Sequence, residues 1–229
     1  MVVVGDSPNG QAVVINVGWP QDRWRLRDQP GINSVALSPD SQWIAAGSRL
    51  GPEVKVWDRA TGRSQTLMPD SVAGGANACV AFSPDGQWLV TGGQGEYRFW
   101  HPGSWRLGRT IPRDRWEEMP GLIAFARDGG SMAITSSQKA VRLIETATGR
   151  TLTNLSGPEL PVIQGLCFSP DDSQLAVTTD NRAIQVWDLR QIRQHLATMG
   201  LDWDLPPLPP PQAGQRGPTV VGAQMDETK

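Results

Sequence analysis

The stretch Val80-Ala81-Phe82-Ser83-Pro84-Asp85 decides the fold, because the chain repeats its pattern three more times. The equivalent stretches end at Asp40, Asp128 and Asp171, so the four aspartates follow one another at steps of 45, 43 and 43 residues. A fixed period of this length indicates a repeat protein in which each unit is one supersecondary element.

A second column of residues keeps the same period. Its first member is the segment Val54-Lys55-Val56-Trp57-Asp58, which returns three times with an apolar residue at the tryptophan position. The residues at that position are Trp57, Trp100, Ile144 and Trp187, 43 or 44 residues apart. Two independent columns with one period argue strongly against a chance match.

Each unit predicts four β-strands. Apolar and polar residues alternate in Val54, Lys55 and Val56, which is the period of a strand with one buried face. The Ser-Pro-Asp segments are typical of turns, because proline presets φ and aspartate bonds to nearby backbone. An apolar run follows each of them, and a second turn, as in residues 60–63, precedes a short fourth strand. Four strands in one such unit correspond to one blade of a β-propeller.

These residues resemble the WD40 repeat family. The resemblance rests on Trp57-Asp58, Trp187-Asp188 and the Ser-Pro-Asp-type turns, and it covers roughly residues 30–190. It implies an all-β, WD40-type β-propeller that is partial, with four repeats and an incomplete N-terminal blade. Two units depart from the pattern, with Trp100-His101 and Ile144-Glu145, and no unit has the family's Gly-His pair. The buried network that links that histidine to the tryptophan is therefore expected to be missing or replaced.

The repeat divides the chain into six segments. The first 28 residues predict three strands, at residues 1–4, 12–17 and 23–27, and the last repeat lacks a fourth strand. An amphipathic helix follows it, because Leu189, Ile192, Leu196 and Met199 share one helical face, and Gly200 is placed to end it. The predicted segments are 1–28 (incomplete blade), 29–70, 71–116 and 117–158 (three WD40 repeats), 159–205 (a fourth repeat with the C-terminal helix) and 206–229 (a disordered, Pro-rich tail).

The end of the chain also resembles the end of WD40 regions in large bacterial multidomain proteins, which often carry a serine/threonine kinase domain. This resemblance lies in residues 187–190 and 200–207. The chain has no Gly-x-Gly-x-x-Gly loop, His-Arg-Asp or Asp-Phe-Gly segment, so the resemblance implies no kinase activity for it.

Composition narrows the class of partner. The 229 residues carry 21 Lys and Arg against 23 Asp and Glu, which argues against a nucleic-acid partner, since phosphate contacts need an excess of positive charge. No apolar run approaches the roughly 18 residues of a membrane span. Cys79 and Cys167 lie in apolar, strand-like runs and are expected to be small buried hydrophobes. This cysteine usage fits a reducing compartment, and we expect a cytoplasmic location.

No catalytic or metal-binding pattern stands out in the sequence. A nucleophilic triad needs a histidine beside serine or cysteine, but His101 replaces a strand-end aspartate and His195 lies in the predicted helix. Metal-ligand spacings such as Cys-x-x-Cys are absent. The glycine-rich residues 92–95 precede no helix and no lysine, which favours a tight loop over a phosphate cradle. We therefore expect no enzyme activity, no cofactor and no metal.

The loops at one face of the propeller are the candidate binding surface. Arginine and tryptophan are enriched in interface hot spots. On this basis four residues are candidates for partner binding: Arg49, Arg115, Trp116 and Arg182. The alternative is that the arginines are only solvated and that Trp116 packs within the protein. The repeated residues are expected to be structural instead: Trp57, Asp58, Trp100, Trp187 and Asp188.

The sequence thus predicts a non-enzymatic WD40 scaffold that binds a protein partner. The alternative is a regulatory or sensor C-terminal part of a bacterial serine/threonine kinase-type multidomain protein. A propeller enzyme would need polar residues converging on the central channel, where the first-strand residues are mostly apolar or small. Because family members usually close at seven or more blades, further blades from a longer parent chain, or a second copy, are expected to complete the ring.

Overall fold

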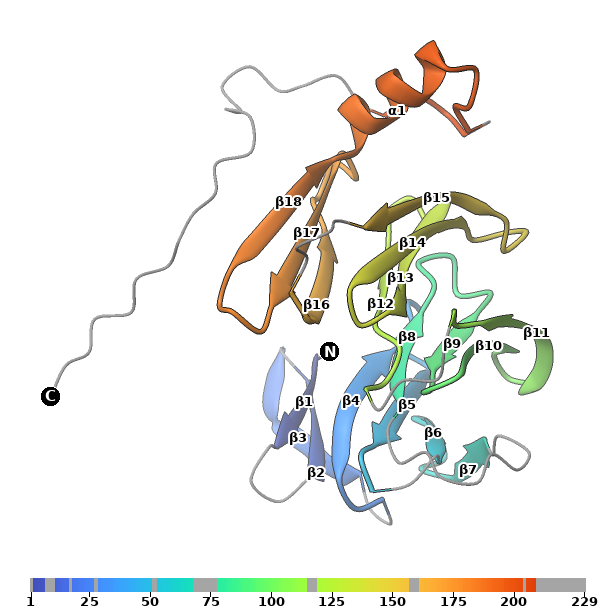
Figure 1. The fold of residues 1–229 in the computed structure, drawn as a ribbon. Coiled ribbons are helices and arrows are strands. Elements are labelled where there is room, and N and C mark those ends of the chain that lie inside the picture. Colours follow the sequence, from blue (N-terminus) through green and yellow to red (C-terminus); the bar gives the residue numbers. More distant parts are fainter. Residues whose placement is uncertain are drawn as a thin grey trace, which may run out of the picture. The chain divides into compact units, whose positions relative to one another are not determined.

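The computed structural model describes residues 2–6, 11–16, 18–26, 29–50, 53–67, 78–114, 119–156, 161–203 and 205–208 (Figure 1). Within these ranges the chain forms five antiparallel sheets and one helix, which confirms the predicted all-β class with a C-terminal helix. The chain divides into two compact units, residues 1–123 and 124–229, and each is described by itself. The predicted Pro-rich tail lies outside the described residues from 209 onward.

The first unit contains three sheets in which consecutive strands lie side by side. The first sheet has three strands, β1 (Val2–Asp6), β2 (Gln11–Asn16) and β3 (Trp19–Leu26). The second has four, β4 (Ile32–Leu37), β5 (Trp43–Ser48), β6 (Val54–Asp58) and β7 (Ser64–Leu67). The third also has four, β8 (Cys79–Phe82), β9 (Leu89–Gly92), β10 (Glu96–His101) and β11 (Arg106–Pro112).

The second unit contains two sheets and the helix. The fourth sheet, whose first strand starts at the boundary, has β12 (Ile123–Phe125), β13 (Ser131–Ser137), β14 (Ala140–Glu145) and β15 (Thr151–Ser156). The fifth has three strands, β16 (Ile163–Phe168), β17 (Gln174–Thr179) and β18 (Ile184–Asp188). The helix α1 (Leu189–Thr198) follows β18 directly. Three strands and then a helix are what the sequence predicts for this end.

The Ser-Pro-Asp turns fold through their own side chains. In the second sheet, the Ser38 hydroxyl donates to the Asp40 carboxylate at 2.5 Å and accepts the Trp43 backbone N–H at 2.8 Å. The same bonds recur in the third sheet, where Ser83 donates to Asp85 at 2.5 Å. Because the partners are two to five residues apart, the turn can form from local sequence alone.

The tryptophan position builds the core between neighbouring sheets of the first unit. Trp57 belongs to a buried cluster that joins the first and second sheets, together with Ala12, Val14, Leu26, Ile32, Ile44 and Ala46. Trp100 belongs to the cluster that joins the second and third sheets. The indole N–H of Trp100 donates to the Thr91 hydroxyl at 3.2 Å, so a bond inside one blade satisfies this buried group.

Two glycines allow neighbouring sheets to approach closely. A Cβ atom at Gly47, in β5, would overlap the backbone carbonyl of Ala78 at the start of the third sheet. A Cβ atom at Gly92, in β9, would overlap the carbonyl of Gly121 in the same way. Both glycines occupy the same position of the repeat, so the close approach is part of how one blade leads into the next.

Two expectations about particular residues need correction. The third strand begins at Trp19 and not near Arg23, because Asn16 accepts the N–H of Gly18 at 3.2 Å and forms a tight turn there. Cys167 is exposed rather than buried. It lies at the repeat position of Ala36, whose side chain packs against the core shared with the next sheet. Since β16 belongs to the last sheet of the described chain, no later sheet covers Cys167 there.

Candidate functional site

Two loops of the first unit each contact the segment that leads into the next blade. The loop that follows β5 contacts the start of the third sheet, because the Ala78 N–H donates to the Ser48 carbonyl at 3.2 Å. The loop that follows β9 makes the equivalent contact one blade later, where the Gly121 N–H donates to the Gly93 carbonyl at 3.0 Å. Each such loop therefore rests on the segment that leads into the next blade.

The loop that follows β5 presents one cation and one apolar side chain to solvent. The Ser48 hydroxyl donates to the Pro30 carbonyl at 2.8 Å and accepts the Leu50 N–H at 3.0 Å. The Arg49 N–H donates to the Gly31 carbonyl at 2.8 Å, and Gly31 has a φ of +69°. These bonds fix the backbone, and they leave Arg49 exposed and the Leu50 side chain 66% exposed.

A buried arginine holds the loops that follow β9 and β11. Arg113 is 6% exposed, and one terminal nitrogen of its guanidinium donates to the carbonyls of Gly93 at 3.3 Å, Gln94 at 3.1 Å and Met119 at 2.7 Å. Its backbone N–H donates to the Gly95 carbonyl at 2.9 Å. Arg113 is thus a positioning residue that joins two loops into one surface, on which Met119 is 40% exposed.

The four predicted partner-binding residues fall in different places. Arg49 lies on the first unit, beside Leu50. Arg115 and Trp116 lie outside the described residues, in the loop whose two ends Arg113 joins. Arg182 is exposed in the second unit, in the turn between β17 and β18, with a φ of +63°. Their role in partner binding stays a prediction.

Sequence reasoning missed Leu50, Met119 and Arg113. An apolar residue between Arg49 and a Gly-Pro pair is a local signal that could have identified Leu50, since that pair predicts an exposed loop. Arg113 carries no such signal, because its three acceptors lie 6 to 20 residues away in the sequence.

We expect Arg113→Lys to loosen this loop pair. A lysine keeps the positive charge, but its side chain is one bond shorter and ends in an ammonium group, so it cannot place a donor where the terminal nitrogen of Arg113 reaches the three carbonyls. Each lost bond to a charged donor costs about 1.5–3 kcal/mol. Cleavage after Glu117 and Glu118 by a glutamate-specific protease should therefore become at least about tenfold faster under native conditions. Arg49→Lys, at an exposed arginine, is the matched control and should leave the rate unchanged. Equal rates for both variants would contradict the positioning role.

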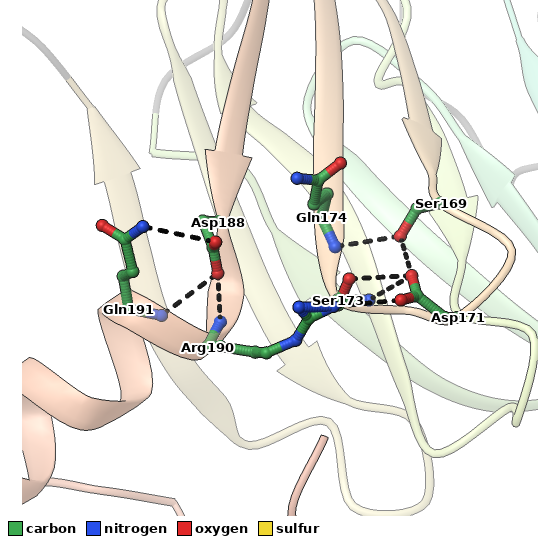
Figure 2. Close-up of polar contacts among 7 residues, drawn as sticks. All are labelled: Ser169, Asp171, Ser173, Gln174, Asp188, Arg190 and Gln191. Carbon is green, nitrogen blue, oxygen red and sulfur yellow. Dashed lines mark hydrogen bonds and ion pairs between the residues drawn. The ribbon is translucent and has the colours of Figure 1, made fainter. Parts of the chain in front are cut away.

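A polar network joins the last sheet to the helix (Figure 2). The Asp171 carboxylate accepts hydrogen bonds from the Ser169 hydroxyl at 2.6 Å and from the Ser173 hydroxyl at 2.7 Å. The Arg190 guanidinium forms an ion pair with the same carboxylate at 3.0 Å. Because Arg190 lies in the first turn of α1, the network holds the helix against the turn between β16 and β17.

The aspartate of the Trp-Asp pair starts the helix. The Asp188 side chain accepts the backbone N–H groups of Arg190 at 2.9 Å and Gln191 at 3.2 Å, as an N-cap does (Figure 2). In the second sheet the equivalent Asp58 accepts the N–H groups of Ala60 and Thr61, and a turn into β7 follows instead. One repeated residue therefore begins a turn in one blade and a helix in another.

Acid should remove the contribution of Asp171 to stability. Hydrogen bonds from Ser169 and Ser173, with the Arg190 contact, hold the pKa of the Asp171 carboxyl well below its usual value. A lowered pKa in the folded state gives stability that is present above about pH 4 and is lost as the pH falls further. Asp171→Asn should therefore cost about 1.5–3 kcal/mol at pH 7, and the difference from the unsubstituted protein should shrink towards pH 2. Urea unfolding at several pH values measures it, and a difference independent of pH would contradict the assignment.

Three titratable side chains of the third sheet, His101, Arg109 and Cys79, take part in packing. The His101 ring lies 4.4 Å from the Trp88 ring, and the Arg109 guanidinium lies 5.0 Å above Trp88. Burial raises the pKa of the Cys79 thiol to about 11, so this thiol is protonated at neutral pH. Among the described residues, no three His, Cys, Asp or Glu side chains are grouped to hold a metal ion. The helix of the described chain is too short and polar to cross a membrane.

The sheets, the turns and the tryptophan cores together define a known class of protein. The sequence profile described as "WD domain, G-beta repeat" matches residues 24–58, 76–101 and 149–188. The chain therefore carries WD40 repeats, and it is a partial WD40-type β-propeller with a C-terminal helix.

Similar proteins include one whose name describes WD repeats. The chain is 30% identical to "Periodic tryptophan protein 2 homolog" of Mus musculus over 193 residues. The aligned region covers 82% of this chain and 20% of that protein. It is 29% identical over 169 residues to "WD repeat-containing protein SL1-17" of Schistosoma mansoni, covering 71% of this chain and 52% of that protein. The chain thus spans about a fifth of the first relative and half of the second.

Solved structures share the fold. "Kuenenia stuttgartiensis Hydrazine Synthase" aligns with a TM-score of 0.63 at 14% identity, over 78% of this chain and 56% of that one. "Crystal Structure of Mitotic Checkpoint Complex" aligns with a TM-score of 0.58 at 21% identity, over 69% of this chain and 47% of that one. At these identities the likeness concerns the fold, so no activity follows from it.

Proposed function

We propose that the chain is a non-enzymatic scaffold that binds a protein partner through the loops at one edge of its blades. The observation that carries the proposal is the pairing of these loops with rigid supports. Among the described residues, Ser48 and Gly31 hold the start of the loop that follows β5, and Arg113 holds the loop that follows β9 together with Met119. A binding surface that is ordered before the partner arrives loses less entropy on association.

The chemistry of this edge fits a protein partner. It combines the exposed cation Arg49 with the exposed apolar side chains of Leu50 and Met119. The loop between Arg113 and Met119 adds Arg115 and Trp116, two residue types that are enriched in interface hot spots. The net charge of −2 gives no general attraction for nucleic acid.

Quantitative pull-down with the intact chain tests the proposal. The double variant Arg115→Ala/Trp116→Ala should recover at least about tenfold less of a specific partner, since a hot-spot residue contributes 2 kcal/mol or more. The double variant Arg59→Ala/Arg63→Ala is the control, because its exposed arginines flank the turn between β6 and β7, at the opposite end of the strands. Equal recovery by all three proteins would refute binding through the loops.

The kinase-type alternative receives no support from the relatives described above. It rests on residues 187–190 and 200–207 alone, and the coding sequence that lies upstream of this chain would decide it. An in-frame kinase domain there would favour that alternative. Completion of the ring by further blades or a second copy, and a cytoplasmic location, stay predictions.

A further inference from the structure

The outer edge of β18 differs from the equivalent edge in the other sheets that contain a full repeat. In those sheets the third strand pairs with a fourth: β6 with β7, β10 with β11 and β14 with β15. Among the described residues, β18 pairs only with β17 (Figure 1). An open edge of this kind offers unpaired backbone groups to another strand.

The open edge leaves one large apolar side chain uncovered. The first residue of β18, Ile184, is 45% exposed. The residues at the same repeat position, Val54, Tyr97 and Val141, are at most 3% exposed. Each of those three lies directly opposite an apolar residue of the fourth strand, respectively Leu67, Ile111 and Leu155. The missing opposite residue accounts for part of this exposure; Val54 also packs against the next sheet, and no later sheet covers Ile184 among the described residues.

The chain after α1 turns back towards β18. Gly200 has a φ of +69°, and the N–H groups of Gly200 and Leu201 donate to the carbonyls of Ala197 and Leu196, which ends the helix in a Schellman motif. Arg193, in the helix, then binds the segment of residues 202–206 that follows.

Five contacts of Arg193 define this return. Its guanidinium binds the Asp202 carboxylate at 3.1 and 3.2 Å. It also donates to the carbonyls of Trp203 at 3.2 Å, Leu205 at 2.9 Å and Pro206 at 2.6 Å. Arg193 is five residues after Asp188, or about 7.5 Å along the helix axis. Arg193 therefore holds Pro206 against the helix that begins at the end of β18.

The remaining chain contains a segment that fits the open edge. Two of the three fourth strands place threonine before the buried apolar residue, as Thr66-Leu67 and Thr110-Ile111, and the third has Asn154-Leu155. The sequence Thr219-Val220 repeats this pair near the C-terminus, after Pro218, which an edge strand tolerates. Ten residues lie between Leu208 and Thr219, so the two are eleven residue steps apart and can lie up to about 36–40 Å from each other. Five residues of β18 are only about 17 Å long, so the segment can reach.

We propose that residues 218–221 add to the open edge of β18 as the fourth strand of the last sheet. Val220 would lie opposite Ile184 and cover it, as Leu67 covers Val54 in the second sheet. Val221 would point to the other face, where the equivalent residues Pro112 and Ser156 are exposed. The pairing would satisfy backbone groups of β18 that could otherwise pair with a strand of another chain.

Hydrogen exchange of the 229-residue chain tests this pairing. In dilute protein, the amides of β18 that face away from β17 should be protected, and Val220→Asp should speed their exchange at least about tenfold. Val221→Asp is the matched control and should leave the protection unchanged. Fast exchange of these amides in the unsubstituted chain would overturn the proposal.

A second copy is the competing occupant of the edge. In that case, protection would rise with protein concentration, light scattering would report a dimer, and Val220→Asp would have no effect. This combination would also overturn the proposal. Because the test does not involve the loops that bear Arg49 and Trp116, its outcome is independent of the proposed scaffold function.

Discussion

Replacing Trp100 by alanine should destabilise the first unit by about 3–5 kcal/mol, the range for removing a large buried aromatic side chain. Trp100 is 8% exposed and lies in the cluster that joins the second and third sheets. Its removal would leave a cavity between two sheets, and it would also deprive the Thr91 hydroxyl of its indole donor. Unfolding in urea, followed by circular dichroism of the β-sheet signal, measures the loss.

The control for this variant is another tryptophan of the same unit. Trp19 begins β3 and is 71% exposed, so Trp19→Ala should change the free energy of unfolding by no more than about 0.5 kcal/mol. If the two variants had equal stabilities, the repeated tryptophan would not be the residue that joins the blades.

Gly92→Ala should have the second largest effect on stability. It should lower the free energy of unfolding by about 2–3 kcal/mol, the upper end of the usual cost of overpacking. The new methyl group would overlap the carbonyl of Gly121 and press on the Tyr97 ring. Because the Gly121 carbonyl is backbone and the Tyr97 side chain is fully buried, neither can move away cheaply. Thermal unfolding of the purified protein would show a lower midpoint.

The neighbouring glycine supplies the comparison. A Cβ atom at Gly93 would have its nearest contact at 3.5 Å, an ordinary van der Waals distance, and its φ is not positive. Gly93→Ala should therefore be close to neutral. A Gly92→Ala protein as stable as Gly93→Ala would mean that the sheets need no close approach at this point.

The fold could be predicted because the interactions that form its turns join residues close together in the sequence. The bond from Ser38 to Asp40 closes a turn within three residues, and the period of these turns divides the chain into blades. The helix was predictable for the same reason, since Asp188 caps it and Gly200 ends it. The buried bond from Trp100 to Thr91 was not predictable in this way, because it depends on the register of β9 and β10.

The candidate site was predictable only in part, because exposure depends on contacts between distant segments. Composition selected Arg49, and the structure leaves this side chain in solvent. Composition could not show that Arg113 is buried, since its acceptors come from separate loops. The prediction that Cys167 is buried was wrong for the same reason, because its exposure follows from its place on the last sheet of the described chain.

The most direct test of the account is hydrogen exchange of the chain with and without a partner recovered by pull-down. Binding through the loops predicts slower exchange at residues 48–53, 93–96 and 113–121, with no change in the turn at residues 58–63. Slower exchange confined to the turn at 58–63, or no change in any of the loops, would contradict the claim that this propeller edge binds the partner.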